Sequence, residues 1–175
     1  MPLMSNVSHL RRRTIPAQMH INPDHFLQTE AGRVVSPERN DEAWASACLA
    51  LESVLALSPR GTKVYVLVGP QGSGKSAWAR VKAASEPQAI IFDAILVKQI
   101  ERAVVLDRVK RLGGFAVAVW FRTPLEVCLA RNANRPIDEV VPEKAVRNVF
   151  AAVEAPTLAE GFKEVVEVPY VPPGG

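Results

Sequence analysis

The chain has 175 residues, which is long enough for one well-formed hydrophobic core and too short for two comfortable domains. Hydrophobic residues make up 48% of it and charged residues 22%, a composition typical of a soluble globular protein. The net charge of +3 is mildly basic, and most of the local asymmetry comes from Arg11, Arg12 and Arg13. Such a cluster is usually a solvated tail, although it would also suit a nucleic acid or a phosphate surface.

The cysteine content and the hydropathy of the chain indicate in which cellular compartment the protein is expected. Cys48 and Cys128 are too few for a disulfide framework or a four-ligand zinc site, and both lie in apolar helical patterns, so we expect buried free thiols. No stretch approaches the roughly 18 consecutive apolar residues that span a bilayer. The positive N-terminus is followed by a polar stretch where a signal peptide needs an apolar one. These features predict a cytoplasmic protein with no membrane partner, and they leave the oligomeric state open.

The N-terminal third of the chain is expected to be an extension. Residues 1–36 are polar and interrupted by prolines without a period, which predicts an extended arm. A first helix is expected over about residues 41–57, capped by Asn40 or Asp41. Its stripe of apolar residues is Trp44, Cys48, Leu51 and Leu55. We therefore assign residues 1–60 to an N-terminal arm and helix.

From Lys63 the pattern alternates between apolar strands and helices. The expected strands are residues 63–69, 89–93, 115–121 and 164–168. Two helices are expected over residues 75–84 and 97–112. A third is expected to start at Thr123-Pro124-Leu125-Glu126, with Thr123 as its cap, and a fourth is opened by Pro142. Near-continuous apolar strands separated by helices indicate a parallel sheet covered on both faces. The predicted fold is an α/β three-layer domain with a central, mostly parallel sheet over residues 61–170, a helical N-terminal extension and a tail at 171–175.

The sequence VLVGPQGSGKSAW lies between the first of these strands and the helix after it. It fits the phosphate-binding loop pattern, a glycine and four residues followed by Gly-Lys-Ser. The residues expected to bind the nucleotide are Gly69, Pro70, Gln71, Gly72, Ser73, Gly74, Lys75 and Ser76. Backbone N–H groups and the helix N-terminus favour phosphate oxygens, Lys75 adds a charge for the β and γ phosphates, and Ser76 can ligate Mg²⁺. A nucleoside triphosphate with Mg²⁺ is therefore the expected cofactor.

The sequence gives weaker evidence on the identity of the nucleobase and on the reaction. The guanine-reading sequence Asn-Lys-x-Asp is absent, which favours ATP. Phosphoryl transfer needs a carboxylate near the acceptor hydroxyl, and Asp93 is the prime candidate because it ends the second strand at the edge where ligands bind. It can serve as the base or, with Ser76, as a ligand of the metal shell. The structural alternative is that Asp93 caps the next helix.

Arg131 and Arg135 lie four residues apart, so both can point the same way where their helix ends. Two arginines there would suit a lid that closes over the triphosphate. The alternative is a solvated face partnered by Asp138 and Glu139.

The segments VYVLVGPQGSGKSAWAR, VCLARNANR, VVPEKAVRNVF and EAPTLAEGF together resemble the polynucleotide 5′-hydroxyl kinase branch of the P-loop kinases, in the same order over about residues 63–168. The resemblance implies Lys75 and Ser76 at ATP·Mg²⁺ and Asp93 at the carboxylate that activates the acceptor hydroxyl. It assigns Arg131 and Arg135 to the lid, with Arg135 the better candidate for phosphate contact.

The chain departs from these relatives in two places. They carry an Arg-Asp-Asp-like group where this chain has Phe92-Asp93-Ala94, and they insert a helical acceptor-binding segment after that Asp. Here the chain runs straight on, so Asp93 can also correspond to a later Asp of the relatives. We expect part of residues 1–60 to pack along the sheet edge near Asp93 and form one wall of the site.

The leading interpretation is a kinase that transfers the γ-phosphate of ATP to a hydroxyl acceptor, with a nucleic-acid 5′ end or a nucleotide-like molecule as the first candidate. Its expected catalytic residues are Lys75, Asp93, Arg131 and Arg135. The alternatives are a kinase for another small molecule and a nucleotide-binding regulatory or interaction module with slow ATP hydrolysis.

Overall fold

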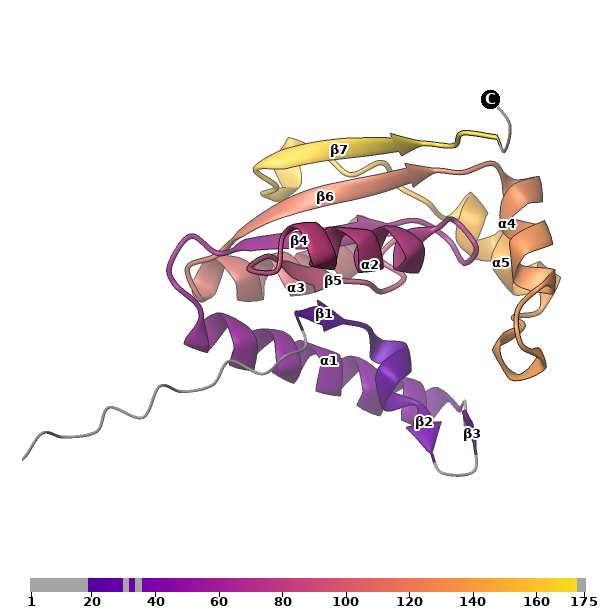
Figure 1. Ribbon diagram of the computed structural model, residues 1–175, viewed down its shortest axis with the longest axis horizontal. Helices are drawn as coiled ribbons and strands as arrows, with labels where there is room; N and C mark the ends of the chain where they lie inside the picture. The colour runs from indigo at the N-terminus through magenta and orange to yellow at the C-terminus, as the bar shows by residue number, and fades with distance from the viewer. Residues whose placement is uncertain (1–18, 30–31, 34–35, 173–175) are drawn as a thin grey trace, which may run out of the picture.

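The computed structural model describes residues 19–29, 32–33 and 36–172, which form a three-layer α/β arrangement (Figure 1). The middle layer is a five-stranded sheet in the order β1-β5-β4-β6-β7, and every pairing in it is parallel. In that order the strands are His20–Ile21, Ile90–Phe92, Lys63–Val68, Phe115–Arg122 and Glu164–Pro169. The predicted fold class is confirmed.

Helices cover both faces of the sheet. Helices α1 (Pro37–Leu57) and α3 (Gln99–Arg111) pack on one face, and α2 (Lys75–Ser85) packs on the other. Helices α4 (Leu125–Ala133) and α5 (Glu143–Ala151) lie beyond the carboxyl ends of the strands (Figure 1). The short elements are η1 (Pro23–Phe26), η2 (Ile137–Glu139), η3 (Leu158–Glu160) and the hairpin of β2 (Gln28–Thr29) with β3 (Gly32–Arg33).

The core is divided by the sheet because successive side chains of a strand point to opposite faces. Val64 and Val66 of β4 pack into the cluster that includes Leu51 of α1, whereas Leu67 packs into the cluster that includes Ala79 of α2. The N-terminal extension therefore shares one core with the rest of the domain. Cys48 and Cys128 are buried free thiols, as expected.

The described part of the N-terminal arm contains an edge strand that the sequence analysis did not predict. Strand β1 pairs with β5 through Ile91 N to Met19 O at 2.7 Å and Asp93 N to Ile21 O at 2.8 Å. A strand of two residues is too short to show a period, so the pattern of the arm gave no sign of it. The arginines at positions 11–13 lie outside the described residues.

Two predicted helix caps are wrong. Helix α1 begins at Pro37 with Ser36 as its cap, whose Oγ accepts a hydrogen bond from Arg39 N, so neither Asn40 nor Asp41 is needed there. Helix α4 has Pro124 at its cap position without a side-chain capping bond. The Thr123 hydroxyl donates instead to Ser73 O at 2.8 Å, which ties the end of β6 to the glycine-rich loop.

A buried ion pair connects α3 to the chain after α5. Arg102, with a fully buried side chain, donates from Nε and Nη2 to Glu160 at 2.7 and 2.8 Å. Its Nη1 donates to the carbonyl oxygens of Leu96, Val97 and Glu154. The guanidinium thus connects α3 to Glu154 and Glu160, which are distant in the chain, and to the turn that precedes α3.

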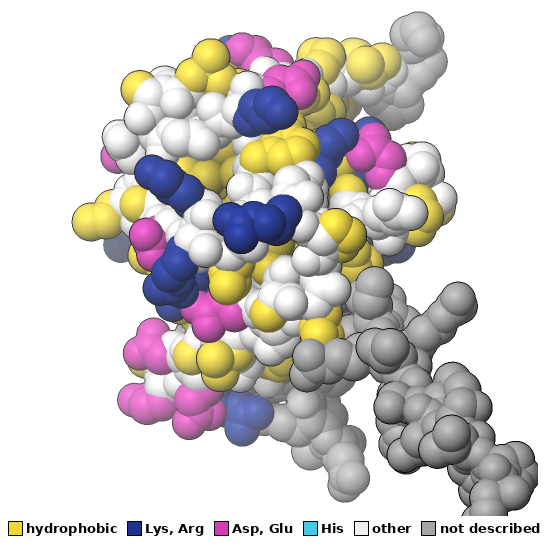
Figure 2. Space-filling model, turned by 90° about the vertical axis from the view of Figure 1, so that its left-hand side faces the viewer, with side chains coloured by type: hydrophobic (Ala, Val, Ile, Leu, Met, Phe, Trp, Pro, Cys, Tyr) yellow, Lys and Arg dark blue, Asp and Glu magenta, His cyan; other side chains and the backbone are white. Residues whose placement is uncertain are grey.

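The amino ends of the strands form the opposite end of the molecule from the glycine-rich loop. Lys and Arg side chains are scattered there among apolar ones (Figure 2). A hollow of about 920 Å³ lies at this end between Arg60, Lys63 and Phe115. No described helix is both long and apolar enough to cross a membrane.

Candidate functional site

The glycine-rich loop joins β4 to α2 and has a backbone that only glycine tolerates at two positions. Gly72 and Gly74 have φ of +76° and +101°, in the left-handed region that favours glycine. A Cβ on Gly72 would also lie 2.4 Å from the carbonyl oxygen of Cys128 in α4. The conformation of the loop therefore depends on these glycines, and the N-terminus of α2 follows it directly. A helix N-terminus that follows a glycine-rich loop is a typical anion site.

Lys75 is held inside this loop. Its ammonium group donates to Gly69 O at 2.7 Å and to Pro70 O at 2.8 Å. Burial lowers the pKa of Lys75 to about 8, the Asp93 carboxylate opposes this effect, and the Arg135 charge adds to it. Ser73 Oγ, also in the loop, is buried without a hydrogen-bond partner among the described residues. A buried unpaired hydroxyl costs stability, so the loop is not optimised for its own folding.

Asp93 follows β5 and lies beside the loop, with only 2% of its surface exposed. Its Oδ2 accepts from Ser76 Oγ at 2.9 Å and from Asn22 Nδ2 at 3.3 Å, and it lies 3.1 Å from His20 Nε2. Burial by itself would raise the pKa of Asp93, but the His20 hydrogen bond, the Lys75 charge and the Ser76 hydrogen bond together lower it. Asp93 is therefore an anion at neutral pH.

The capping alternative for Asp93 is excluded by the position of the next helix. Helix α3 starts at Gln99, six residues lie between it and the end of β5 at Phe92, and its cap position is Lys98, whose backbone N donates to Glu101 Oε2 at 2.9 Å. Asp93 instead makes its side-chain contacts with the loop and the N-terminal segment.

Arg131 and Arg135 both line the hollow that the loop forms with α2, about 190 Å³ in volume. Arg131 Nη1 donates to Gly72 O at 3.3 Å. Asn132, between them, bonds both backbone groups of Val141 and thereby closes the chain after α4 into a fixed loop that carries Arg135. Within the described part of the chain, no ion pair joins either arginine to Asp138 or Glu139, so the solvated-face alternative lacks the partners it invoked.

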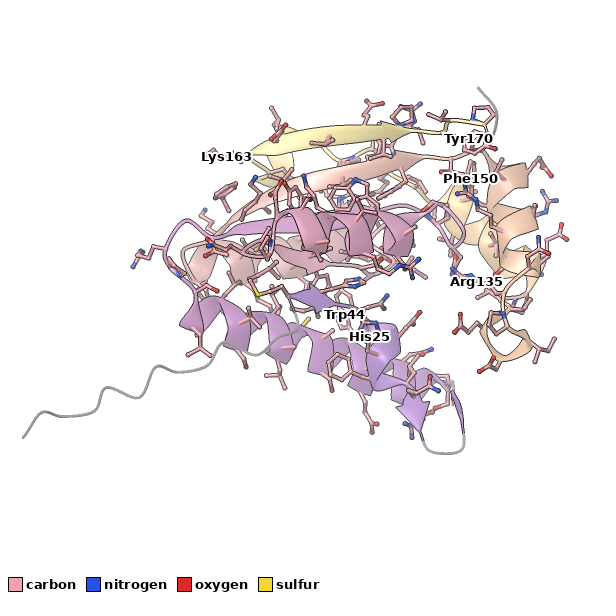
Figure 3. The ribbon with its side chains drawn as sticks, in the orientation of Figure 1. His25, Trp44, Arg135, Phe150, Lys163 and Tyr170 are labelled. Carbon is pink, nitrogen blue, oxygen red and sulfur yellow. The ribbon has the colours of Figure 1, made fainter. Side chains whose placement is uncertain are left out.

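Two larger hollows flank this phosphate-sized one. The first, of about 490 Å³, shares Ser73, Gly74 and Arg131 with it. Its far walls are Trp78, Phe121 and the residues after β7, where Arg131 lies 5.7 Å from the centre of the Tyr170 ring. Figure 3 shows Tyr170 and Arg135 at the same end of the sheet.

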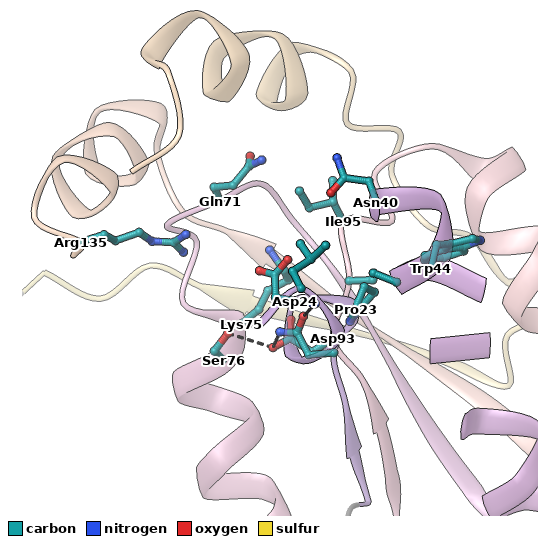
Figure 4. A pocket seen from close by; sticks show the side chains of 14 residues that line it. Pro23, Asp24, Asn40, Trp44, Gln71, Lys75, Ser76, Asp93, Ile95 and Arg135 are labelled. Atoms are coloured by element: carbon teal, nitrogen blue, oxygen red, sulfur yellow. Dashed lines mark hydrogen bonds between the residues drawn. The ribbon is translucent and has the colours of Figure 1, made fainter. Parts of the chain in front are cut away.

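The second flanking hollow, of about 330 Å³, shares Lys75, Ser76 and Arg135 with the phosphate-sized one and contains Asp93. We call it the acceptor-side pocket. Its remaining walls come from the N-terminal segment, α1 and the chain around the loop and β5: Asn22, Pro23, Asp24, Leu27, Asn40, Ala43, Trp44, Gln71, Ala94 and Ile95. In Figure 4, Arg135 points toward Lys75 from one side, and Asn40 and Trp44 lie on the other.

The prediction that part of residues 1–60 forms a wall near Asp93 is confirmed. Asn22 contacts Asp93 directly, and η1 and α1 supply much of the pocket wall. The individual residues Asp24, Asn40 and Trp44 were not predicted, because nothing local in the sequence relates them to a loop that starts 25 or more positions further along the chain. The contact of His20 with Asp93 was not predicted either, because it depends on the unpredicted strand β1.

Fold and loop together define a P-loop NTPase-like, nucleotide-binding domain. A family model described as an AAA domain matches residues 80–156, less than half of the chain, and supports a P-loop kinase-like protein. The matched residues begin in α2, after the loop, and include Asp93, Arg131 and Arg135. No curated protein matches the chain.

Proposed function

We propose that the protein is an ATP-dependent kinase that transfers the γ-phosphate to a hydroxyl acceptor. The observation that carries the proposal is the row of three adjoining hollows, in which the middle one is built on the phosphate-binding loop. A nucleotide that lies along this row would place its last phosphate next to Lys75, Ser76 and Arg135, at the mouth of the acceptor-side pocket.

The hollow beside Tyr170 has the properties of a nucleobase site. A flat base would fit against Trp78 and Phe121, with the Arg131 guanidinium available for stacking, an interaction worth about 0.5–2 kcal/mol. The absence of the guanine-reading sequence makes adenine the preferred base. ATP would then extend from this hollow across Gly72–Gly74 toward Asp93.

The loop residues would act mainly by positioning and by charge. The Lys75 ammonium would leave the carbonyl oxygens of Gly69 and Pro70 to bind phosphate oxygens, and Arg131 of α4 and Arg135 of the following loop would cover the phosphates. Ser76 Oγ and Asp93, already 2.9 Å apart, fit the protein side of a Mg²⁺ site. When bound, the ion would neutralise charge on the transferring phosphate.

This contact favours the metal-shell role of Asp93 over the base role. A general base works best when its pKa lies near the working pH, whereas the pKa of Asp93 is lowered by its surroundings. Its Oδ2 is also engaged by side chains from three segments.

The test is to incubate the protein with γ-labelled ATP, Mg²⁺ and a panel of 5′-hydroxyl oligonucleotides, nucleosides and small hydroxylated metabolites. We expect label to appear on at least one acceptor with the wild-type protein and on none with Lys75→Ala. ATP turnover to ADP and free phosphate that no acceptor accelerates, with no labelled acceptor, would contradict the proposal and favour the regulatory module.

A further inference from the structure

The N-terminal extension holds Asp93 through the backbone as well as through side chains. Strand β1 pairs in parallel with β5, so the two strands end at the same edge of the sheet. Asp93 N donates to Ile21 O at 2.8 Å, which continues the backbone ladder one residue past the end of β5. The position of the Asp93 backbone is therefore fixed by β1, at the edge where the phosphate-binding loop lies.

His20 and Asn22 both reach the Asp93 carboxylate because they stand two residues apart in an extended segment, where alternate side chains point to the same face. Ile21, between them, packs into the core on the other face of the sheet. His20 Nε2 lies 3.1 Å and Asn22 Nδ2 lies 3.3 Å from Asp93 Oδ2. Since Asp93 is an anion, His20 carries a proton on Nε2 and donates it to this oxygen.

Both donors are held in position by further contacts of their own. The Asn22 amide is fixed at both ends, because its Oδ1 accepts from Asp24 N at 2.9 Å, which caps η1, while its Nδ2 donates to Asp93. The His20 ring lies edge-on against the His25 ring, with ring centres 5.5 Å apart. The two donors therefore restrict the rotation of the Asp93 side chain.

The orientation of Asp93 determines the orientation of Ser76, and this step rests on the proposed Mg·ATP site. A hydroxyl group has one proton and two lone pairs. Ser76 Oγ donates its proton to Asp93 Oδ2 at 2.9 Å, so its lone pairs face away from the carboxylate and are available to a cation. All these hydrogen bonds fall on Oδ2, and within the described part of the chain none falls on Oδ1, so that oxygen can face the water shell of a metal ion.

We propose that His20 and Asn22 are positioning residues that hold the Asp93 carboxylate, and through it Ser76, in the arrangement that binds Mg²⁺ with the nucleotide. They act through Asp93 and are not ligands themselves. Groups that orient the ligands of a metal in this way typically change metal affinity by about 10–100-fold when they are removed. The N-terminal extension thereby sets how tightly the nucleotide loop holds its metal ion.

The test measures the Mg²⁺ requirement of nucleotide binding. Calorimetry with a non-hydrolysable ATP analogue, repeated over a series of Mg²⁺ concentrations, gives the concentration at which Mg²⁺ has half its effect and the Kd without Mg²⁺. We expect His20→Ala to raise the half-maximal Mg²⁺ concentration by about tenfold or more. The Kd without Mg²⁺ should not change, because Lys75 and the loop backbone remain. His20→Gln keeps an N–H donor of similar reach and should restore most of the wild-type behaviour.

Asn22→Ser tests the second donor, because serine still caps η1 but is too short to reach Asp93. It should raise the Mg²⁺ requirement as His20→Ala does. Ile21→Val is the matched control on the same strand: it weakens core packing and leaves both donors, so it should lower Tm without changing the Mg²⁺ requirement.

Two results would overturn the inference and leave the nucleotide site standing: a wild-type Mg²⁺ requirement in folded His20→Ala and Asn22→Ser variants, or the same increase in Ile21→Val. If Mg²⁺ had no effect on binding to the wild-type protein, both this inference and the proposed Mg·ATP site would be wrong. Binding is measured without an acceptor, so a failure of the phosphoryl-transfer proposal is detected separately.

Discussion

Three side chains from three segments meet on one oxygen of Asp93: Ser76 from α2, His20 from β1 and Asn22 before η1. This arrangement connects the nucleotide loop to the N-terminal extension through a single carboxylate. The sequence predicts where Asp93 stands, because an apolar strand that ends in an acidic residue at the ligand edge has a local signal. It does not predict the partners from the arm, because their placement depends on a two-residue strand.

For Asp93→Asn we expect turnover to fall by about a hundredfold or more, the scale of losing a group that stabilises charge in the transition state. Nucleotide affinity should change much less, because the loop backbone and Lys75 remain. Steady-state kinetics with ATP titrations would measure both. A loss of thermal stability with no selective loss of turnover would assign Asp93 to the core rather than to the reaction.

Lys75→Ala and Ser76→Ala test the loop. The backbone conformation depends on Gly72 and Gly74 and not on these side chains, so both variants should fold. Calorimetry should show abolished or strongly weakened binding of Mg·ATP, with the circular dichroism spectrum unchanged. An unaltered ATP affinity for Lys75→Ala would refute the assignment of this loop.

Arg135→Ala should lower phosphoryl transfer and leave folding almost unchanged, because partly exposed charges of this kind contribute at most about 1 kcal/mol. Arg135→Lys should not restore the full rate, since lysine lacks the planar, two-pronged contact of arginine. Arg147→Ala on α5, where the side chain pairs with Glu143, is a control of the same type away from the loop. Wild-type rates in both Arg135 variants would eliminate its role over the phosphates.

At the scale of elements, the sequence predicts most strands and helices because their apolar periods are long enough to read. The wrong predictions concern helix caps, where another group competes for the same hydrogen bond or position. Thr123 has the right type and position for a helix cap, yet its hydroxyl donates to Ser73 O in the glycine-rich loop. Ser36 caps α1 earlier than expected, because Pro37 can occupy the first helical position.

The element-scale prediction concerns Arg102, which joins α3 to Glu154 and to Glu160 of η3. Arg102→Met should reduce the free energy of unfolding by about 3–5 kcal/mol, because it leaves the Glu160 carboxylate buried and unpaired. Chemical denaturation would measure this change. Arg111→Met, which removes a 58% exposed partner of Glu52, is the control and should cost at most about 1 kcal/mol. Equal effects of the two substitutions would contradict the structural role of the buried pair.

At the scale of the whole molecule, the N-terminal extension is part of both the fold and the site. It contributes an edge strand, a core helix and much of the acceptor-side pocket. Removing residues 1–36 would therefore delete β1 along with the part of the pocket wall that residues 22–27 form, so point substitutions in the pocket separate function from folding more cleanly. The resemblance to the polynucleotide kinase branch is what led us to expect that the N-terminal residues replace a missing wall. The residues that replace it come together only through the tertiary fold.

The central claim is that base, phosphates and acceptor occupy three adjoining hollows along the carboxyl edge of the sheet. The most direct measurement is a crystal structure with Mg²⁺ and a non-hydrolysable ATP analogue. We predict the base between Trp78 and Tyr170, the phosphates on Gly72–Ser76 and the γ-phosphate facing Asp24 and Asn40 across the pocket. A nucleotide whose terminal phosphate points away from this pocket, or that binds outside the loop, would contradict the account.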